Sequence, residues 1–244
     1  MERSVYQRLD QLEGNHWWFC ARRKIISALI GRFAPKKANL RVLEAGCGTG
    51  GNLAMLSRFG KIDAFELDDE ARAIAKTKMP IDVKPGMLPD GIPFKPGSFD
   101  VVTAFDVIEH VEQDVASLGR LGEQLAPDGR LFMTVPALPW LWSKHDETHH
   151  HFRRYTKASL DETLRKAGLE PVRVSYFNTL LFPLIAGLRL MRKKLGITEV
   201  ADDAMPGRFT NAVLKAVFGA ESNVVGLVPL PIGVSLMAVA KRAK

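Results

Sequence analysis

The chain lacks the residues and tracts that mark several classes of protein. Among its 244 residues there are only two cysteines, Cys20 and Cys47, so a disulfide framework is not expected, and neither cysteine has a metal-type spacing. Internal repeats and low-complexity tracts are also absent. Residues 1–4 are polar and no apolar signal core follows them, which favours a cytoplasmic protein.

Long hydrophobic runs are missing as well. A membrane-spanning helix needs about 20 uninterrupted apolar residues. Residues 180–188 are apolar but interrupted by Pro183, and the 17 residues of 224–240 contain Pro229 and Pro231 together with two glycines. We therefore expect no transmembrane segment.

Acidic residues are scarce in the C-terminal part of the chain. Residues 152–244 hold 15 Lys and Arg against 7 Asp and Glu, a net charge of +8, whereas the first 151 residues hold 19 against 20. A basic surface can attract nucleic acid, anionic lipid or an acidic small molecule, or it can simply aid solubility. We expect no nucleic-acid partner and keep peripheral contact with an anionic membrane, at its inner face, as an open alternative.

The remaining composition is that of an ordinary folded protein, with 46% apolar and 25% charged residues. From residue 40 onward short apolar segments alternate with amphipathic ones, which is typical of a parallel sheet with crossover helices. The predicted strands are 40–44, 62–66, 82–84, 100–105, 130–135, 170–176 and 233–241. The predicted helices are 5–11, 22–33, 52–59, 69–78, 107–125 (with a break near its start), 157–167, 179–195 and 208–218.

The strongest motif is the glycine-rich turn EAGCGTGG at residues 44–51, between a predicted strand and a predicted helix. Glycines there let the backbone turn tightly and approach a ligand closely. The G-x-G-x-x-G spacing from Gly46 also matches the dinucleotide fingerprint, with Glu66 where a ribose carboxylate is expected. However, the carboxylate of Glu44 would repel a pyrophosphate and attract an ammonium group. The motif thus favours S-adenosylmethionine over NAD without excluding NAD by itself.

Three segments taken together resemble the successive motifs of class I S-adenosylmethionine-dependent methyltransferases: residues 42–52, 98–111 and 126–131. The resemblance spans roughly residues 40–176. It implies an α/β fold with a Rossmann-like doubly wound sheet of seven strands, the last one antiparallel. It also implies S-adenosyl-L-methionine as the cofactor, bound along the carboxyl ends of the first strands.

On this basis the chain is expected to form a single methyltransferase domain with additions. N-terminal helices precede the first strand, and a helical insertion precedes the last one. The expected parts are an N-terminal helical cap (1–38), a cofactor-binding core (39–176), a helical insertion or acceptor cap (177–231) and the last strand (232–244).

The resemblance also implies which residues hold the cofactor. The glycines would lie under the methionine part, Glu66 would accept the ribose hydroxyls, and Leu67 would pack on the adenine. The family often has an Asp after the third strand, but this chain has Met87 and Leu88 there, which would contact the adenine instead. The complete predicted set is Trp18, Arg22, Glu44, Ala45, Gly46, Gly48, Gly50, Asn52, Glu66, Leu67, Met87, Leu88, Phe105, Asp106 and His110.

Asp106, Glu109 and His110 form a candidate metal site, because residues spaced i, i+3 and i+4 share one helical face. A similar spacing occurs in quinone-biosynthesis O-methyltransferases that use a divalent ion, although with Glu in the first position. The same acid–histidine pair is common in relatives that look metal-free. We predict no metal here, and none at the histidines of residues 145–151.

A second unusual run, PWLWSKHDETHHHFRRYT at residues 139–156, follows the fifth predicted strand. Together with residues 175–178 and 228–235 it resembles a bacterial methyltransferase subgroup whose acceptors are mostly unassigned. The positions that recur in that subgroup match His145, Asp146, His151, Arg154 and Tyr155.

Methyl transfer needs a nucleophile held in line with the sulfonium and sometimes a base to deprotonate it. His145 or His151 could be that base, oriented by Asp146. Arg153 or Arg154 could hold an acidic group of the acceptor. The predicted substrate-binding residues are Trp140, Trp142, Arg154 and Tyr155. Alternatively, Arg154 and Tyr155 only dock the next helix and the histidines lie on the surface.

Two further segments allow two interpretations each. The aromatic residues 16–19 could cover the cofactor, with Arg22 meeting its carboxylate, or could be core packing. Residues 179–196 place an apolar run before four basic residues, as in an interfacial helix, or as in a cap over the acceptor pocket.

The predicted function is methyl transfer from S-adenosyl-L-methionine to oxygen or nitrogen of a small-molecule or lipid-linked acceptor. The alternatives are an NAD-dependent oxidoreductase and a membrane-surface binding module that retains the fold.

Overall fold

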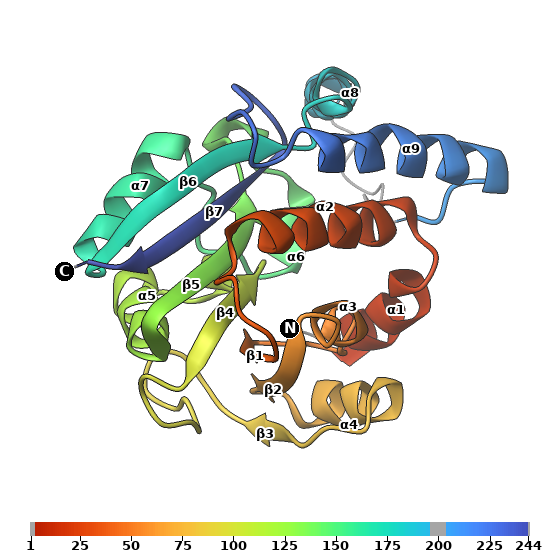
Figure 1. Cartoon of the computed structure of the whole chain (residues 1–244). Helices are drawn as coiled ribbons and strands as arrows, with labels where there is room; N and C mark the ends of the chain where they lie inside the picture. Colours follow the sequence, from red (N-terminus) through yellow and green to blue (C-terminus); the bar gives the residue numbers. More distant parts are fainter. Residues whose placement is uncertain (1–2, 196–203, 244) are drawn as a thin grey trace.

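The computed structural model describes residues 3–195 and 204–243, and its centre is a seven-stranded sheet (Figure 1). Residues 196–203 of the predicted insertion lie outside the described residues. The strands are β1 Leu40–Ala45, β2 Gly60–Glu66, β3 Val83–Pro85, β4 Phe99–Phe105, β5 Leu125–Pro136, β6 Leu169–Phe177 and β7 Ser235–Arg242. All seven predicted strands are present. Only β5 differs markedly, since it begins five residues earlier than predicted, where Leu125 pairs with Phe99 ahead of a bulge.

The order of strands across the sheet is β3-β2-β1-β4-β5-β7-β6. The pairs among β1, β2, β3, β4 and β5 are parallel, whereas β7 is antiparallel to both β5 and β6. This confirms the predicted Rossmann-like sheet with an antiparallel last strand. As a result of the reversal, Ser235 at the start of β7 pairs with Pro136 at the end of β5 and with Phe177 at the end of β6.

The helices that accompany the sheet are mostly those expected from the sequence. They are α1 Arg3–Glu13, α2 Trp17–Phe33, α3 Leu53–Leu56, α4 Asp69–Lys78, α5 Asp114–Glu123, α6 Lys144–Thr148, α7 Lys157–Lys166, α8 Phe182–Leu195 and α9 Arg208–Ala220, with 3-10 turns at Ile108–His110, Pro139–Leu141 and Glu221–Asn223.

Two helix predictions were inaccurate, and one short helix was not predicted. The helix expected over 52–59 is the short α3, because Gly60 already begins β2 beside Leu40. The helix expected from residue 22 starts at Trp17, where the ring nitrogen of His16 accepts a hydrogen bond from Trp18 N and caps the helix. The short α6 was not predicted, and it starts with a capping box between Ser143 and Asp146.

Two hydrophobic layers hold the helices on the sheet, because successive side chains of a strand point to opposite faces. Val42 and Val101 belong to a cluster that includes residues of α2, α3 and α4. Leu43 and Val102 belong to a second cluster with residues of α5 and α7. The sheet is therefore covered on both faces.

The segment between β6 and β7 carries α8 and α9, and α9 lies along α2 (Figure 1). Phe218 of α9 is fully buried and stacks on Trp18 of α2 at 5.1 Å between ring centroids. The insertion is thus anchored to the N-terminal helices. In the part of the chain that the structure describes, we find no helix with the length and hydropathy needed to cross a membrane.

Candidate functional site

A cavity of about 1080 Å³ opens at the edge of the sheet where the parallel strands end. This edge is where open α/β sheets bind their ligands. Its wall is built by the glycine turn after β1, the ends of β2 and β4, the loop after β5, and helices α1, α2 and α8. It therefore joins the predicted cofactor motif to the predicted acceptor segments in one space.

The glycine turn has the backbone conformation that its composition predicted. Gly46, Gly48 and Gly50 all have positive φ, at 62°, 53° and 83°. A Cβ on Gly48 would meet nothing within 4 Å, because this residue faces the cavity. A Cβ on Gly50 would lie only 3.0 Å from the backbone of Ala75. Gly48 thus leaves room for a ligand, while Gly50 allows α4 to pack closely.

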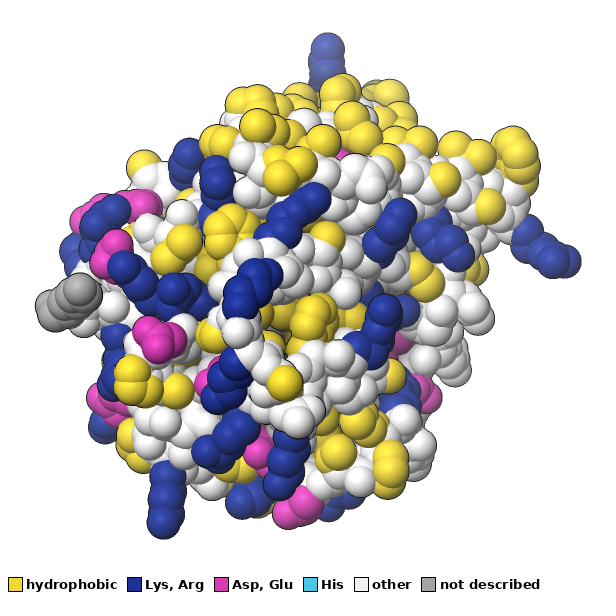
Figure 2. Space-filling model, in the orientation of Figure 1, with side chains coloured by type: hydrophobic (Ala, Val, Ile, Leu, Met, Phe, Trp, Pro, Cys, Tyr) yellow, Lys and Arg dark blue, Asp and Glu magenta, His cyan; other side chains and the backbone are white. Residues whose placement is uncertain are grey.

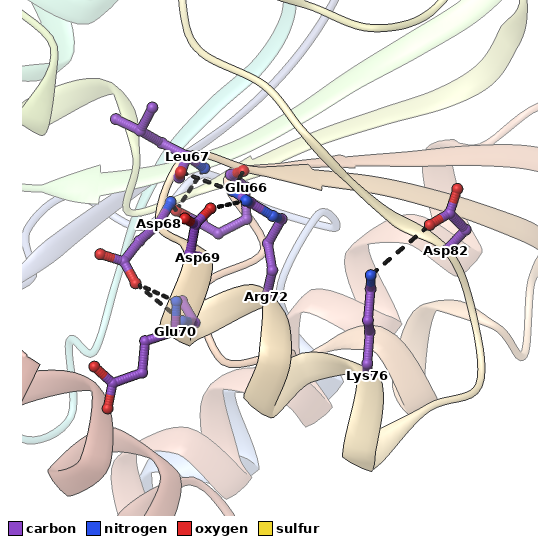
Figure 3. A network of polar contacts seen from close by, with 9 residues as sticks. Glu66, Leu67, Asp68, Asp69, Glu70, Arg72, Lys76 and Asp82 are labelled. Atoms are coloured by element: carbon purple, nitrogen blue, oxygen red, sulfur yellow. Dashed lines mark hydrogen bonds and ion pairs between the residues drawn. The ribbon is translucent and has the colours of Figure 1, made fainter.

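Glu66, at the end of β2, is the centre of a polar network shown in Figure 3. Its Oε1 accepts hydrogen bonds from the backbone N–H groups of Leu67 (2.8 Å) and Asp68 (3.0 Å), and its Oε2 accepts one from Gly48 (2.8 Å). A carboxylate offers about four lone-pair positions. Glu66 therefore retains room for one ligand hydroxyl and can accept a second if the Gly48 bond is exchanged.

Arg72 holds the turn that carries Glu66. Its Nη1 donates to the carbonyl oxygens of Glu66 (2.9 Å) and Leu67 (2.7 Å), and its guanidinium also pairs with Asp69 (Figure 3). The side chain of Leu67 extends away from this network, is 64% exposed and lines the cavity. This is the position expected for an adenine contact.

The other predicted cofactor residues divide into two groups. Those that line the cavity are Trp18, Arg22, Gly46, Gly48, Asn52, Glu66, Leu67, Met87, Leu88, Phe105, Asp106 and His110. Glu44, Ala45 and Gly50 do not line it, since Glu44 and Ala45 belong to β1 and Gly50 packs against Ala75 of α4.

Glu44 is buried, and its Oε1 accepts a hydrogen bond from Asn52 at 2.9 Å. Among the described residues its Oε2 has no hydrogen-bond partner. Burial raises the pKa of Glu44 from 4.5 to about 8, although Asn52 and Arg22 act in the opposite direction. Glu44 is therefore mainly a neutral acid at pH 7 that supports the turn, and it does not present to the cavity the carboxylate that was expected to attract a ligand ammonium group.

A buried arginine connects α2 to the ends of β4 and β5. Arg22 pairs with Asp106 Oδ2 at 2.6 Å and donates to Thr134 Oγ1 at 3.0 Å. Asp106 has a positive φ of 55° and accepts a second hydrogen bond from Thr134, at 3.0 Å. This trio places a guanidinium inside the cavity, where it can face a ligand carboxylate.

Glu13, at the end of α1, was missed by the sequence analysis. Its carboxylate accepts a hydrogen bond from the hydroxyl of Thr49 in the glycine turn and pairs with Lys78 of α4 at 2.6 Å. Glu13 also lines the cavity, together with Tyr6 and Leu9 of α1. No local sequence pattern could reveal a contact between residues 36 positions apart.

Asp146 organises the loop after β5. It is fully buried, and its carboxylate binds His151 Nδ1 (2.9 Å), Arg154 Nε (2.7 Å) and Arg154 Nη2 (2.9 Å). Burial alone would raise the pKa of Asp146, but the hydrogen bonds from His151 and Arg154 outweigh it and hold the pKa far below its ordinary value. Asp146 is therefore ionised, and its bond to Nδ1 fixes the orientation of the His151 ring.

Histidines gather on the cavity side of this loop. The ring of His151 lies 4.6 Å from that of His110, and His145 lies 4.2 Å from His149, between centroids. Burial, followed by the neighbouring His151 and His149, lowers the pKa of His110 from 6.5 to about 3, so it is neutral at pH 7. His110, His145, His149 and His151 all line the cavity, although His149 was not among the predicted residues.

Three of these side chains could together hold a metal ion. One ligand atom each of Glu109, His110 and His151 lie within 4.8 Å of one another. Burial, with Asp106 nearby, raises the pKa of Glu109 well above its ordinary value. Glu109 and His110 belong to the candidate metal motif of the sequence, and His151 comes from the next loop. Asp106, the third residue of that motif, pairs with Arg22 instead.

The structure does not bring three of the predicted acceptor-binding residues to the cavity. Trp140 and Trp142 are 48% and 37% exposed and lie outside its lining. Tyr155 is buried and donates to Asp114 Oδ2 at 2.8 Å.

Arg154 does line the cavity, but its guanidinium donates to Asp146 and to Ala137 O (3.0 Å). Arg153 pairs with Asp114 instead. The loop thus uses its arginines and tyrosine to fix its own shape.

Comparison with known proteins gives a matching family. Residues 18–174 match the model of a methyltransferase domain. A ubiquinone biosynthesis O-methyltransferase of Xanthomonas euvesicatoria is 29% identical over 157 residues, which cover 57% of this chain and 66% of that protein. The corresponding enzyme of Xanthomonas axonopodis is 28% identical over 189 residues, or 66% and 78% of the two chains. The chain thus spans slightly less than two thirds of the first of these relatives.

Solved structures share the fold. A Haloferax volcanii protein in complex with the Trm112 methyltransferase activator superposes with a TM-score of 0.65 at 18% identity, covering 99% of this chain and 95% of its own. The phosphoethanolamine N-methyltransferase 2 of Haemonchus contortus, in complex with S-adenosyl-L-methionine, has a TM-score of 0.57 at 18% identity, covering 90% and 52%. These comparisons give no support to the NAD-dependent or binding-module alternatives.

The raised pKa of Glu44 predicts a pH-dependent stability. Between about pH 4.5 and 8 the native state keeps the Glu44 proton that the unfolded chain releases, so stability falls as pH rises. We expect the unfolding free energy of the wild type, relative to Glu44→Gln, to fall by a few kcal/mol, as an order of magnitude, between pH 5 and 8. Urea denaturation at several pH values measures this difference.

The matched control is Glu123→Gln, because Glu123 is exposed on α5, where it pairs with Arg120. Its stability profile should run parallel to that of the wild type. A Glu44→Gln profile that is also parallel to the wild type would show that Glu44 does not hold its proton in the native state.

Proposed function

The chain belongs to the class I S-adenosylmethionine-dependent methyltransferases, and on this premise we propose that it methylates an oxygen or nitrogen of an apolar small-molecule or lipid-linked acceptor. The observation that carries the proposal is the single cavity that joins the glycine turn and Glu66 to the histidine loop and the insertion. The printed names of the two Xanthomonas relatives favour oxygen as the methylated atom.

The reaction is an in-line displacement at the methyl carbon. When bound, S-adenosylmethionine would supply the methyl group: its carbon–sulfur bond would break as the acceptor oxygen or nitrogen bonds to the carbon, and the electron pair would stay on the sulfur. Since the sulfonium already supplies a good leaving group, the protein's tasks are to align the two molecules and to remove the acceptor's proton.

We assign proton removal to His151. Asp146 accepts the hydrogen of Nδ1, so in the matching neutral tautomer Nε2 carries no proton and can accept one. When the acceptor hydroxyl gives its proton to Nε2, the imidazolium that forms is stabilised by the ionised Asp146. His145 lines the same cavity and remains a second candidate for the base.

The acceptor end of the cavity is apolar with a basic rim. Leu181, Leu184, Ile185 and Leu188 line it from the start of the insertion and from α8, and Arg189 and Arg192 line it from the following turn of α8. A lipid-like or polycyclic acceptor fits such a wall better than a free sugar does, because apolar side chains give no partners to sugar hydroxyls.

We also propose that this part of the molecule contacts an anionic membrane. Figure 2 shows hydrophobic side chains gathered over α8 and α9, with Lys and Arg side chains around them. Leu190, Met191 and Leu195 of α8 are 51%, 51% and 63% exposed, and Phe209 of α9 is 82% exposed. Apolar side chains flanked by basic ones are typical of interfacial helices.

Cofactor binding is the first test of the function. Calorimetry should show that S-adenosylhomocysteine binds the wild type, and that Glu66→Gln weakens binding about tenfold or more, because a charged hydrogen bond to the ribose is lost. Glu70→Gln is the matched control, since Glu70 lies on α4 outside the cavity lining (Figure 3). Absence of binding to the wild type would contradict the proposed function.

Turnover with a panel of phenol, catechol and amine acceptors tests the base. We expect His151→Asn to lower kcat by about two to four orders of magnitude without changing S-adenosylhomocysteine affinity. His150→Asn should retain wild-type turnover, because His150 is exposed, lies outside the cavity lining and has a φ of 55° that Asn tolerates.

The same assay in EDTA tests the predicted absence of a metal. We expect turnover to be unchanged. Loss of activity in EDTA and its recovery with a divalent ion would instead make Glu109, His110 and His151 a metal site and would remove His151 from the role of base.

Membrane contact is tested by sedimentation with phosphatidylglycerol vesicles. The wild type should co-sediment, and Phe209→Glu should reduce the bound fraction severalfold, since a charge replaces an exposed ring. Val172→Glu, on β6 and away from α8 and α9, should bind as the wild type does. Equal binding of both variants would contradict this contact.

A further inference from the structure

The residue that follows β6 is a buried asparagine. Asn178 is fully buried, lines the cavity and has a positive φ of 57°. Within residues 3–195 and 204–243, neither its Oδ1 nor its Nδ2 has a hydrogen-bond partner. Buried side-chain amides nearly always have partners in folded proteins, because an unpaired one loses its hydration without compensation.

The turn at this position does not need the amide. The backbone N–H groups of Asn178 (2.7 Å), Thr179 (2.7 Å) and Leu180 (2.9 Å) all donate to the carboxylate of Glu221, which follows α9. Asparagines with positive φ commonly bond their own backbone nearby, but here Glu221 already accepts those donors. A glycine would adopt this backbone conformation more easily. The turn therefore explains the backbone but leaves the side chain unexplained.

The position of Asn178 connects it to the acceptor end of the cavity. It follows Phe177, which pairs with Ser235 and stacks on Trp18 at 6.2 Å between ring centroids. Trp18, Ser235 and Leu181 line the same cavity. Asn178 thus follows the strand at one edge of the sheet, β6, whereas the predicted adenine contacts Met87 and Leu88 follow β3 at the other edge.

We propose that Asn178 binds the acceptor, and that its amide selects a neutral group that can both donate and accept a hydrogen bond, such as a hydroxyl. This inference rests on the proposed function and names a feature of its substrate. The amide offers two donors and one acceptor, which matches a hydroxyl in either orientation.

The surroundings disfavour an anionic group at this point. Glu221 places a buried carboxylate against the backbone of Asn178, so an anionic ligand group would be repelled. A hydroxyl avoids that repulsion and satisfies the amide. A site that hydrogen-bonds a substrate hydroxyl also rejects the analogue that lacks it, because the buried polar groups are then left unpaired.

The test uses the full chain saturated with S-adenosylhomocysteine and three probes: catechol, benzoate and toluene. The side-chain NH₂ signal of Asn178 in a ¹H–¹⁵N correlation spectrum is identified by its absence from Asn178→Gly. We expect catechol to shift this signal and benzoate and toluene to leave it in place. Asn178→Gly should weaken catechol binding about tenfold, or about 1.4 kcal/mol, and leave toluene binding unchanged.

Thermal unfolding separates this role from a structural one. Asn178→Gly should keep its Tm within about 2 °C of the wild type, because glycine suits the backbone and no protein hydrogen bond is lost. The matched control is Asn211→Ala, because Asn211 accepts from Trp17 N (2.8 Å) and donates to Asn15 O (2.9 Å). Its Tm should fall by about 4 °C or more.

Each outcome decides the inference. A catechol complex that leaves the Asn178 signal unmoved, equal shifts from benzoate, or no catechol binding at all would overturn it. A Tm loss in Asn178→Gly as large as that of Asn211→Ala would show a structural role and overturn it too. If S-adenosylhomocysteine itself fails to bind, the proposed function fails first, so the two failures are distinguishable.

Discussion

The reversed direction of β7 is the constraint on which the arrangement of the site depends. Because β7 is antiparallel to both neighbours, it begins at the edge where β5 and β6 end, and Ser235 pairs there with Pro136 and Phe177. The chain must therefore return to the cavity before it enters its last strand. This return brings both ends of the insertion to the edge that already carries the glycine turn and the histidine loop. A parallel last strand would have started at the opposite edge of the sheet.

Local sequence patterns were sufficient to predict the strands and most of the helices. The apolar run at residues 100–105 and the glycine turn each depend on neighbours a few positions away, so period and spacing reveal them. The start of α2 and the existence of α6 depend instead on single capping side chains, His16 and Ser143. Such caps are determined by side-chain geometry that hydrophobic periodicity does not contain.

The site could be predicted only where the chemistry is local. Glu66 follows from its distance to the glycines, and the Asp146–His151 pair follows from a short loop. Glu13 could not be found because its partner Thr49 lies 36 positions away, and no local pattern marks Asn178, whose side chain has no hydrogen-bond partner among the described residues. Trp140 and Trp142 were assigned to the acceptor because of their residue type, but composition does not tell on which side of a loop a ring lies.

The hydrogen bonds between Glu221 and residues 178–180 affect how the sequence between β6 and β7 can evolve. They close the insertion at its base, so the segment that carries α8 and α9 leaves and rejoins the sheet at one point. A segment closed in this way can vary in length or be exchanged as a unit while the strands on either side keep their register. Acceptor preference could therefore diverge among descendants, or be altered by design, through changes in α8, whereas α9 stays coupled to α2 through the stacking of Phe218 on Trp18.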